Sequence, residues 1–227
     1  MCGRFSITGD LDFYAEYFAV DEVVTRALEK SWNVAPTDPV YVVSERDGKR
    51  MLGSMKWGLV PHWAKDTRSI HINARAETIA TNNTFRESFV KRRLLIPADG
   101  FYEWEPPEQG RKPHWVYRAD GFPMVFAGIW SSRHDPDTDE WHRTCSILTT
   151  AAEGTIATIH DRMPVRLALD VWDRWLDRDL TDPETTLGML RSPDMSEVME
   201  HPVSKDVNSV KNNSPHLHDR EIPGSLF

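Results

Sequence analysis

The sequence predicts an α+β fold in which short helices flank a curved, mainly antiparallel, barrel-like β-sheet. Segments with strand character come in clusters, and helical segments occur at intervals between them rather than in strict alternation. The chain has 227 residues, which fits one large domain or two small ones, and 40% of them are hydrophobic, enough for a sizeable core. Because no internal repeat or linker-like change of composition divides the chain, we expect a single domain over residues 1–227.

The N-terminal part begins with a short strand and a capped helix. Residues 3–8 can form the strand, and Asp10 can cap a helix over residues 11–18, whose apolar side chains share one face. The other elements expected here are a weakly helical or looped segment at 21–30, a turn at 33–36, strands at 40–44 and 50–57 joined by a hairpin turn, an aromatic loop at 57–63, a strand at 73–77 and a helix at 84–91.

In the second half a run of strands comes first, short helices follow, and the chain ends in a tail. Strands are expected at 94–97, 100–105, 114–118, 124–131 and 143–149, and helices at 150–159, 171–176 and 181–191. A turn at 98–100 separates the first two of these strands. The tail begins with a strand near 201–204 and is rich in loops from about residue 205.

Charge and cysteine content exclude several classes of protein. The net charge of −8 does not indicate nucleic-acid binding by the whole molecule, so any such site has to be a local basic patch. The two cysteines, Cys2 and Cys145, form no CxxC pair, and we expect no metal or cofactor. Acidic residues interrupt the N-terminus, and no apolar run approaches the length of a membrane span. We therefore expect a soluble, reduced, cytoplasmic monomer.

Cys2 is the most unusual candidate for chemistry. If the initiator Met1 is removed, Cys2 carries a free α-amine and a thiol on adjacent carbons. The amine can form a Schiff base with an aldehyde, and the thiol can then attack the imine carbon and close a five-membered thiazolidine ring. The alternative is an ordinary residue in a frayed terminus.

Two other titratable residues stand in contexts that suit proton transfer. Glu103 lies among aromatic residues in an expected strand, so partial desolvation would raise its pKa. His160 follows a helix-like segment and could act as an acid or a base. The simpler alternatives are a solvent-facing Glu103 and a surface His160 that caps a helix.

Basic and aromatic residues could together form a groove for single-stranded DNA, in which bases stack on rings and cations hold phosphates. Trp57, Trp63 and Trp104 would supply the rings, and scattered arginines and lysines the charge. Such charges can equally form a solvated face. In the expected strand at 73–77, Asn73, Arg75 and Glu77 would share one face.

Six motifs occur in order along the chain. They are Met1-Cys2-Gly3-Arg4, Asn33-Val34-Ala35-Pro36, Trp57-Gly58-Leu59-Val60-Pro61, Asn73-Ala74-Arg75-Ala76-Glu77-Thr78, Ile96-Pro97-Ala98-Asp99-Gly100-Phe101-Tyr102-Glu103-Trp104 and His160-Asp161-Arg162-Met163-Pro164. Together with His201-Pro202-Val203-Ser204 they resemble the SOS-response-associated peptidase (SRAP) family over nearly the whole chain. Its members sense abasic sites in single-stranded DNA and crosslink to them through the N-terminal cysteine.

The resemblance implies a role for each matching position. Cys2 would be the nucleophile, Asn73 would position it and the sugar, Glu103 would shuttle protons around the amine and imine, and His160 would open the sugar ring and reverse the crosslink. The residues implied in DNA binding are Arg4, Arg75 and Arg162 at phosphates, Asn33 and Pro36 in the pocket wall, and Trp63 as a wedge in the strand. His62 stands where some relatives have a second tryptophan, so the resemblance implies a weaker wedge here.

Three functions therefore stand side by side. The first is a covalent abasic-site sensor with lyase character, the second an N-terminal-cysteine peptidase or amidohydrolase, and the third a non-covalent single-stranded DNA-binding module. An ionised Glu103 beside the α-amine would stabilise the ammonium and suppress its nucleophilicity. Either Glu103 is neutral in the free protein, or it accepts the proton of the amine directly.

Overall fold

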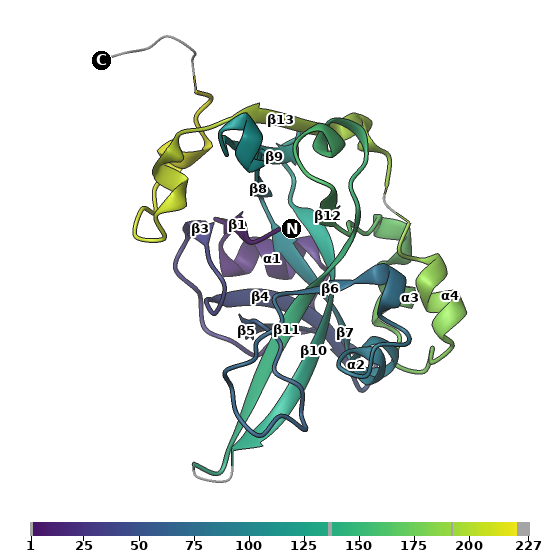
Figure 1. Ribbon diagram of the computed structural model, residues 1–227. Coiled ribbons are helices and arrows are strands. Elements are labelled where there is room, and N and C mark those ends of the chain that lie inside the picture. The colour runs from purple at the N-terminus through teal and green to yellow at the C-terminus, as the bar shows by residue number, and fades with distance from the viewer. Residues whose placement is uncertain (1, 136–137, 192, 222–227) are drawn as a thin grey trace.

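The computed structural model describes residues 2–135, 138–191 and 193–221 (Figure 1). Its strands form two sheets, and the helices are short. The predicted α+β class and the predicted mainly antiparallel, barrel-like sheet are confirmed. Of the helices in the described ranges, none is long and apolar enough to cross a membrane.

The larger sheet contains a closed ring of five strands. In ring order they are β5 (Lys49–Trp57), β4 (Pro39–Arg46), β7 (Arg93–Ala98), β10 (Met124–Asp135) and β11 (Glu140–Ala151). Four of the pairings are antiparallel, and the parallel pairing of β5 with β11, through Lys56 with Thr144 and Trp57 with Cys145, closes the ring. Because β10 and β11 are longer than their neighbours, their joined ends project from the barrel as a hairpin (Figure 1).

Three short strands extend this barrel at its edges. They are β2 (Glu22–Val23), which pairs with β5, and β6 (Asn73–Arg75) and β12 (Arg162–Pro164), which both pair with β11. Both β6 and β12 pair with the same stretch of β11, since Ile147 lies opposite Asn73 and Ala151 lies opposite Arg162. Two chain segments that are far apart in sequence therefore meet at one end of β11.

The second sheet is fully antiparallel. Its strands are, in spatial order, β13 (Val198–Pro202), β9 (Pro113–Arg118), β8 (Gly100–Trp104), β1 (Arg4–Ile7) and β3 (Ser31–Val34). Although β7 and β8 are separated only by Asp99, they do not pair with each other, and the chain passes from one sheet to the other at this point. Asp99 fixes the chain where it crosses between the sheets, because its carboxylate accepts hydrogen bonds from the hydroxyl of Ser6 and the backbone N–H of Thr8.

The helices cover the outside of the barrel. They are α1 (Leu11–Tyr17), α2 (Arg86–Lys91), α3 (Trp172–Leu176) and α4 (Pro183–Gly188), the last three on one flank (Figure 1). As predicted, Asp10 caps α1, since its carboxylate accepts a hydrogen bond from the backbone N–H of Phe13 at 3.0 Å.

Aromatic contacts join the two sheets and fix the N-terminus. Phe5 of β1 packs edge-on against Trp57 with ring centroids 4.8 Å apart, and against Phe126 at 6.2 Å. Phe101 of β8 also meets Phe126, at 6.1 Å. All four rings are buried, and edge-to-face pairs of this kind add about 0.5–1.5 kcal/mol each beyond their buried area. The chain just before Phe5 is thereby held against the seam of the barrel.

Several expected elements were wrong. Residues 150–159 are not a helix, because β11 continues to Ala151 and only a 3-10 turn, Gly154–Thr158, follows. The β-branched Thr149 and Thr150 favour the strand, and Gly154 adopts a positive φ of 57° that an α-helix does not allow. Asn33 lies in a strand rather than in a turn.

The strand expected at 73–77 is also shorter than predicted. It ends at Arg75, and Ala76–Thr78 form a 3-10 turn, so Glu77 does not share a strand face with Asn73. Over residues 205–221, the part of the tail that the structure describes, the chain forms loops and two 3-10 turns, Lys205–Asn208 and Pro215–His218, as its loop-rich composition predicted.

Candidate active site

Cys2 lies directly before β1 and is completely buried. Its sulfur is 3.9 Å from the carbonyl oxygen of Arg4, a weak contact. Burial raises the pKa of the Cys2 thiol above its ordinary range, and the nearby Glu103 carboxylate adds to the rise. The thiol is therefore neutral in this environment, and it needs a base at the moment it reacts.

Asn73 binds Cys2 directly. Its side-chain N–H donates to the carbonyl oxygen of Cys2 at 2.8 Å. The strand that carries Asn73 is itself fixed, because the indole N–H of Trp57 donates to the carbonyl oxygen of Ile72 at 2.9 Å. Among the described residues, the buried Oδ1 of Asn73 has no hydrogen-bond partner. A buried acceptor without a partner is costly, so this oxygen is available to a donor that arrives with a ligand.

Glu103 faces the same cluster from β8. Side chains alternate along a strand, so Glu103 shares the face of Phe101, which points at the barrel, while Tyr102 points away and donates to the carbonyl oxygen of Trp32. Glu103 is 3% exposed, and burial raises the pKa of its carboxyl group, although the nearby His160 opposes the rise. The predicted desolvation is confirmed, and Glu103 can hold a proton closer to neutral pH than an ordinary glutamate.

His160 approaches Glu103 from the segment between the 3-10 turn and β12. Its Nε2 is 4.0 Å from a carboxylate oxygen of Glu103. Its Nδ1 accepts a hydrogen bond from the backbone N–H of Arg162 at 2.9 Å and also lies 2.8 Å from a carboxylate oxygen of Asp161. In the neutral ring the first contact places the proton on Nε2, toward Glu103. In the charged ring the Nδ1–H can donate to Asp161 instead.

These four residues form the Cys2 cluster, which consists of Cys2, Asn73, Glu103 and His160. An open pocket with a volume of about 650 Å³ lies outside Glu103 and His160. Its lining includes Trp104, which was predicted as a ring of a possible DNA groove, Arg111, one of the scattered basic residues considered for that groove, and Asn208, which was not predicted. Trp104 is held in the wall because its indole N–H donates to the side chain of Asn208 at 2.7 Å. The aromatic ring of Trp104 and the charge of Arg111 are signals in the sequence, whereas Asn208 carries none.

Arg4 and Asn33, both predicted to bind DNA, are occupied within the protein. The guanidinium of Arg4 donates to the side-chain oxygen of Asn33 at 2.7 Å and to the carbonyl oxygen of Val207 at 3.0 Å. Asn33 is buried, and its side-chain N–H groups donate to three carbonyl oxygens of the tail, those of Val207, Ser209 and Asn212. In the free protein this pair fastens the C-terminal tail to the second sheet.

Arg162 also has partners inside the protein. It forms a two-pronged ion pair with Glu77, with N–O distances of 2.6 and 2.8 Å, and donates to the carbonyl oxygen of Thr149 at 2.7 Å. The Arg162 side chain is only 12% exposed, whereas that of Glu77 is 48% exposed. The guanidinium of Arg162 lowers the pKa of Glu77, so the pair is charged at neutral pH.

The other predicted DNA-binding residues are more open. Arg75 is exposed on β6, on the same strand face as Asn73, and no partner for its guanidinium occurs among the described residues. Trp63 is 59% exposed in the loop after β5, and Pro36 is half-buried after β3. Among the described residues, no hydrogen bond, ion pair or ring contact joins Trp63 or Pro36 to Cys2, Asn73, Glu103 or His160. Within the described ranges, no three His, Cys, Asp or Glu side chains are grouped to hold a metal ion.

Comparisons with known proteins agree with this arrangement. The profile of the family described as SOS response associated peptidase (SRAP) matches residues 1–210. The chain is 36% identical to the abasic site processing protein YoqW of Bacillus subtilis, over 96% of this chain and 98% of the relative. It is 31% identical to the abasic site processing protein YedK of Escherichia coli, over 96% and 98% of the two chains. A crystal structure of a protein from Bacteroides thetaiotaomicron superposes with a TM-score of 0.86 at 25% identity, covering 97% of this chain and 100% of the other.

Proposed function

The chain belongs to the SRAP family, and from this premise we propose that it processes abasic sites in single-stranded DNA. The relatives compared above are named abasic site processing proteins, and the single-stranded substrate is part of the proposal. In this proposal Met1 is removed, and Cys2 then forms a thiazolidine crosslink with the ring-opened sugar, which shields the lesion during the response to DNA damage. The protein acts as a monomer where the DNA is, in the cytoplasm or at a bacterial nucleoid.

One observation carries the proposal: an amide, a carboxyl group and an imidazole converge on the second residue of the chain. Asn73 donates to the carbonyl oxygen of Cys2 at 2.8 Å, and Glu103 lies between Cys2 and His160. An ordinary frayed terminus would be exposed and would not collect buried groups capable of proton transfer. The three groups come from β6, β8 and the segment before β12, so the fold is what assembles them.

The chemistry begins with the amine of processed Cys2. The aldehyde of the opened sugar accepts the amine nitrogen, and the resulting carbinolamine loses water to give an imine. The Cys2 thiol then adds to the imine carbon, which forms the C–S bond while the thiol proton moves to the nitrogen. Because a carbonyl oxygen leaves as water, the crosslink weighs the sum of the two reactants less one water. Elimination of the 3′ phosphate from the imine would instead cleave the strand, which is the lyase branch of the proposal.

Glu103 and His160 supply the proton transfers. A neutral Glu103, favoured by its burial, leaves the amine nucleophilic and gives a proton to the departing hydroxyl. Once ionised, the same carboxylate can take the proton of the buried thiol. His160, with its Nε2 toward Glu103, opens the sugar ring and returns the proton when the crosslink reverses. The Oδ1 of Asn73 accepts from the amine or from a sugar hydroxyl.

The test is intact-protein mass spectrometry after incubation with single-stranded DNA that carries one abasic site. We expect an added mass equal to the DNA less one water, and none with intact DNA. Cys2→Ala abolishes this adduct, whereas the matched Cys145→Ala, which removes the other buried thiol, keeps it. Cys2→Ser keeps an imine that borohydride traps, because the amine survives.

The same samples separate the alternatives. A stable adduct in Cys2→Ala would end the thiazolidine mechanism, and equal binding of intact and abasic DNA without any adduct would indicate the non-covalent module. Hydrolysis of acyl substrates that depends on Cys2 would indicate the peptidase. Protein in which the mass shows that Met1 is retained serves as the internal control, since its Cys2 nitrogen is an amide and should not react.

A further inference from the structure

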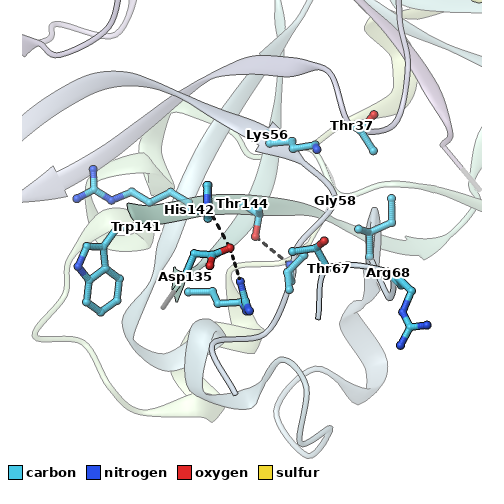
Figure 2. Close-up of a pocket in the computed structure, with 13 residues that line it drawn as sticks. Thr37, Lys56, Gly58, Thr67, Arg68, Asp135, Trp141, His142 and Thr144 are labelled. Atoms are coloured by element: carbon cyan, nitrogen blue, oxygen red, sulfur yellow. Dashed lines mark hydrogen bonds and ion pairs between the residues drawn. The ribbon is translucent and has the colours of Figure 1, made fainter. Parts of the chain in front are cut away.

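A second hollow, with a volume of about 570 Å³, lies on the barrel seam where β5 and β11 pair (Figure 2). Figure 2 shows its three walls: Lys56 comes from β5, Trp141 and His142 from the projecting hairpin, and Thr67 and Arg68 from the loop after β5. We call this hollow the seam groove. The functions considered so far assign nothing to it.

The walls of the seam groove are fixed by the protein itself. Arg133 on β10 donates to the carbonyl oxygens of Ala64 at 3.0 Å and Lys65 at 3.4 Å, which ties the loop to the hairpin. On the floor, the hydroxyl of Thr144 accepts a hydrogen bond from the backbone N–H of Val60 at 2.9 Å. Arg133 also pairs with the carboxylate of Asp135, another lining residue, at 3.5 Å. The groove is therefore formed before any ligand arrives, and the charge of Arg133 is balanced inside the protein.

Two other cations of the seam groove are free to bind. Lys56 and Arg143 are both exposed, and the side chains of both are without a hydrogen-bond or ion-pair partner in the described part of the chain. Arg143 directly precedes Thr144, which is paired with Lys56, so the two cations lie on neighbouring strands. In a chain with a net charge of −8, two unpaired cations beside one hollow form a local site for anions.

An exposed aromatic ring lies beside these cations. Trp141 is 64% exposed and is two residues from Arg143 on β11, so their side chains leave the strand on the same side. Its ring is braced by His134 across the hairpin, with centroids 5.1 Å apart. A large ring that stays in solvent has apolar area to bury, and every nucleobase offers a flat face that can cover it.

We propose that the seam groove binds single-stranded DNA next to the lesion, with phosphates at Lys56 and Arg143 and a base stacked on Trp141. This inference rests on the proposed function and extends it from the lesion to its flanking nucleotides. Along β11, the partner of Lys56 and the partner of Asn73 are Thr144 and Ile147, three residues apart. At about 3.3 Å per residue this is roughly 10 Å, a span that one continuous strand of a few nucleotides covers.

The test measures affinity with oligonucleotides that carry the abasic site near the 5′ end, near the 3′ end or in the middle. The variant is Lys56→Gln with Arg143→Gln, and its matched control is Lys49→Gln, an exposed lysine at the opposite end of β5. Two phosphate contacts on a single strand are worth a salt slope of about 1.4, or roughly 25-fold at 0.1 M salt. We expect the double variant to lose this affinity for the oligonucleotide with the central abasic site and for one of the two with the site near an end. The third oligonucleotide lacks the flanking nucleotides that reach the groove, so its affinity should not change.

Stacking is tested separately. Trp141→Ala should weaken binding to the same oligonucleotides by at least about fivefold, and Trp141→Phe should restore most of it, because a ring remains to stack. Equal losses on all three oligonucleotides, or no loss with the double variant, would overturn the inference. So would a preference of the groove for duplex DNA. Failure of the proposed function looks different, since no variant and no oligonucleotide would then give the crosslink mass.

Discussion

The Cys2 cluster and the seam groove differ in what their polar groups do in the free protein. In the cluster Cys2 and Glu103 are buried and Asn73 and His160 are half-buried, and the groups interact with one another: Asn73 donates to Cys2, and Glu103 lies near both Cys2 and His160. The groove is open, and Lys56 and Arg143 have no partner within the described part of the chain. The burial that shifts pKa values suits proton transfer, while exposure suits reversible contact with phosphates. Reaction rate and affinity should therefore respond to different substitutions.

The three arginines predicted to bind phosphates also differ in whether they have a partner within the protein. Arg4 and Arg162 are bound to Asn33 and Glu77 respectively, whereas Arg75 is exposed beside Asn73. A bound arginine has to exchange an internal partner for a phosphate, and this exchange reduces the gain in affinity. Arg75 has no partner to lose among the residues that the structure describes. Of the three, we expect Arg75 to contribute most to the affinity for DNA.

The largest effect should come from His160→Ala. General acid–base groups contribute on the order of a hundredfold or more to rate, so crosslinking at saturating DNA should slow by that factor while affinity changes little. The measurement pairs a binding titration with single-turnover crosslinking. His216→Ala, an exposed histidine of the tail, is the control and should change neither quantity. If His160→Ala instead lowers affinity and reacts normally once saturated, His160 is a binding residue and not the proton carrier.

Glu103→Gln should change the stability of the fold and the rate of crosslinking in opposite directions. Because the pKa of Glu103 is raised in the folded protein, its folded form binds a proton more tightly than its unfolded form. The stability from this group is complete below the ordinary glutamate pKa and is lost as the pH rises through the raised one. Glutamine has no such loss, so the variant should be more stable at pH 7, and the difference should vanish near pH 4.

Thermal unfolding at both pH values checks this prediction. A gain of about 1 kcal/mol would raise the Tm by roughly 2–4 °C in a chain of this size. The matched control is Glu108→Gln, an exposed glutamate in the turn after β8, which should leave the Tm unchanged. Crosslinking by Glu103→Gln should be slow despite its stability. A lower Tm at pH 7 would mean that the charged carboxylate stabilises the fold, contrary to its burial.

The sequence predicted the strands well, because alternation and turn residues are local signals. It also placed Glu103 among aromatic residues, and the structure confirms its burial. It did not predict that β5 and β11 close a barrel, since this pairing joins residues that are 88 positions apart in the sequence, Lys56 with Thr144 and Trp57 with Cys145. The seam groove depends on that closure, and no motif in the sequence marks it.

The roles of Arg4, Asn33 and Arg162 show a second limit of prediction from the sequence. Their motifs indicate a site, but whether a guanidinium is free depends on partners such as Glu77 and Val207, which only the fold brings near. Likewise, the expected helix at 150–159 was wrong because a long-range pairing extends β11 through Thr149 and Thr150. Local propensity predicts secondary structure poorly where a long-range strand pairing determines it.

The smallest effect concerns the ion pair between Glu77 and Arg162. If Arg162 holds a phosphate beside the lesion, Glu77 competes with that phosphate, and its low pKa keeps the competition active at neutral pH. Glu77→Gln should therefore raise the affinity for abasic DNA by about two- to fivefold, because the carboxylate of Glu77 is half-exposed and an ion pair that is open to solvent on one side is worth about 1 kcal/mol. Arg162→Gln should lower the affinity. Salt-dependent binding titrations measure both changes.

The matched control for Glu77→Gln is Glu87→Gln. Glu87 is also about half-exposed and also pairs with an arginine, Arg92, at 3.1 Å, so the two variants change the net charge equally. An equal rise in both would be a general charge effect, and it would give no support to a phosphate at Arg162. A fall in Glu77→Gln alone would mean that Glu77 orients Arg162 rather than competes for it. The prediction is confirmed only if the affinity for abasic DNA rises in Glu77→Gln alone and the rise disappears when Arg162→Gln is added. Glu77 then occupies, in the free protein, the position at Arg162 that a phosphate takes in the complex.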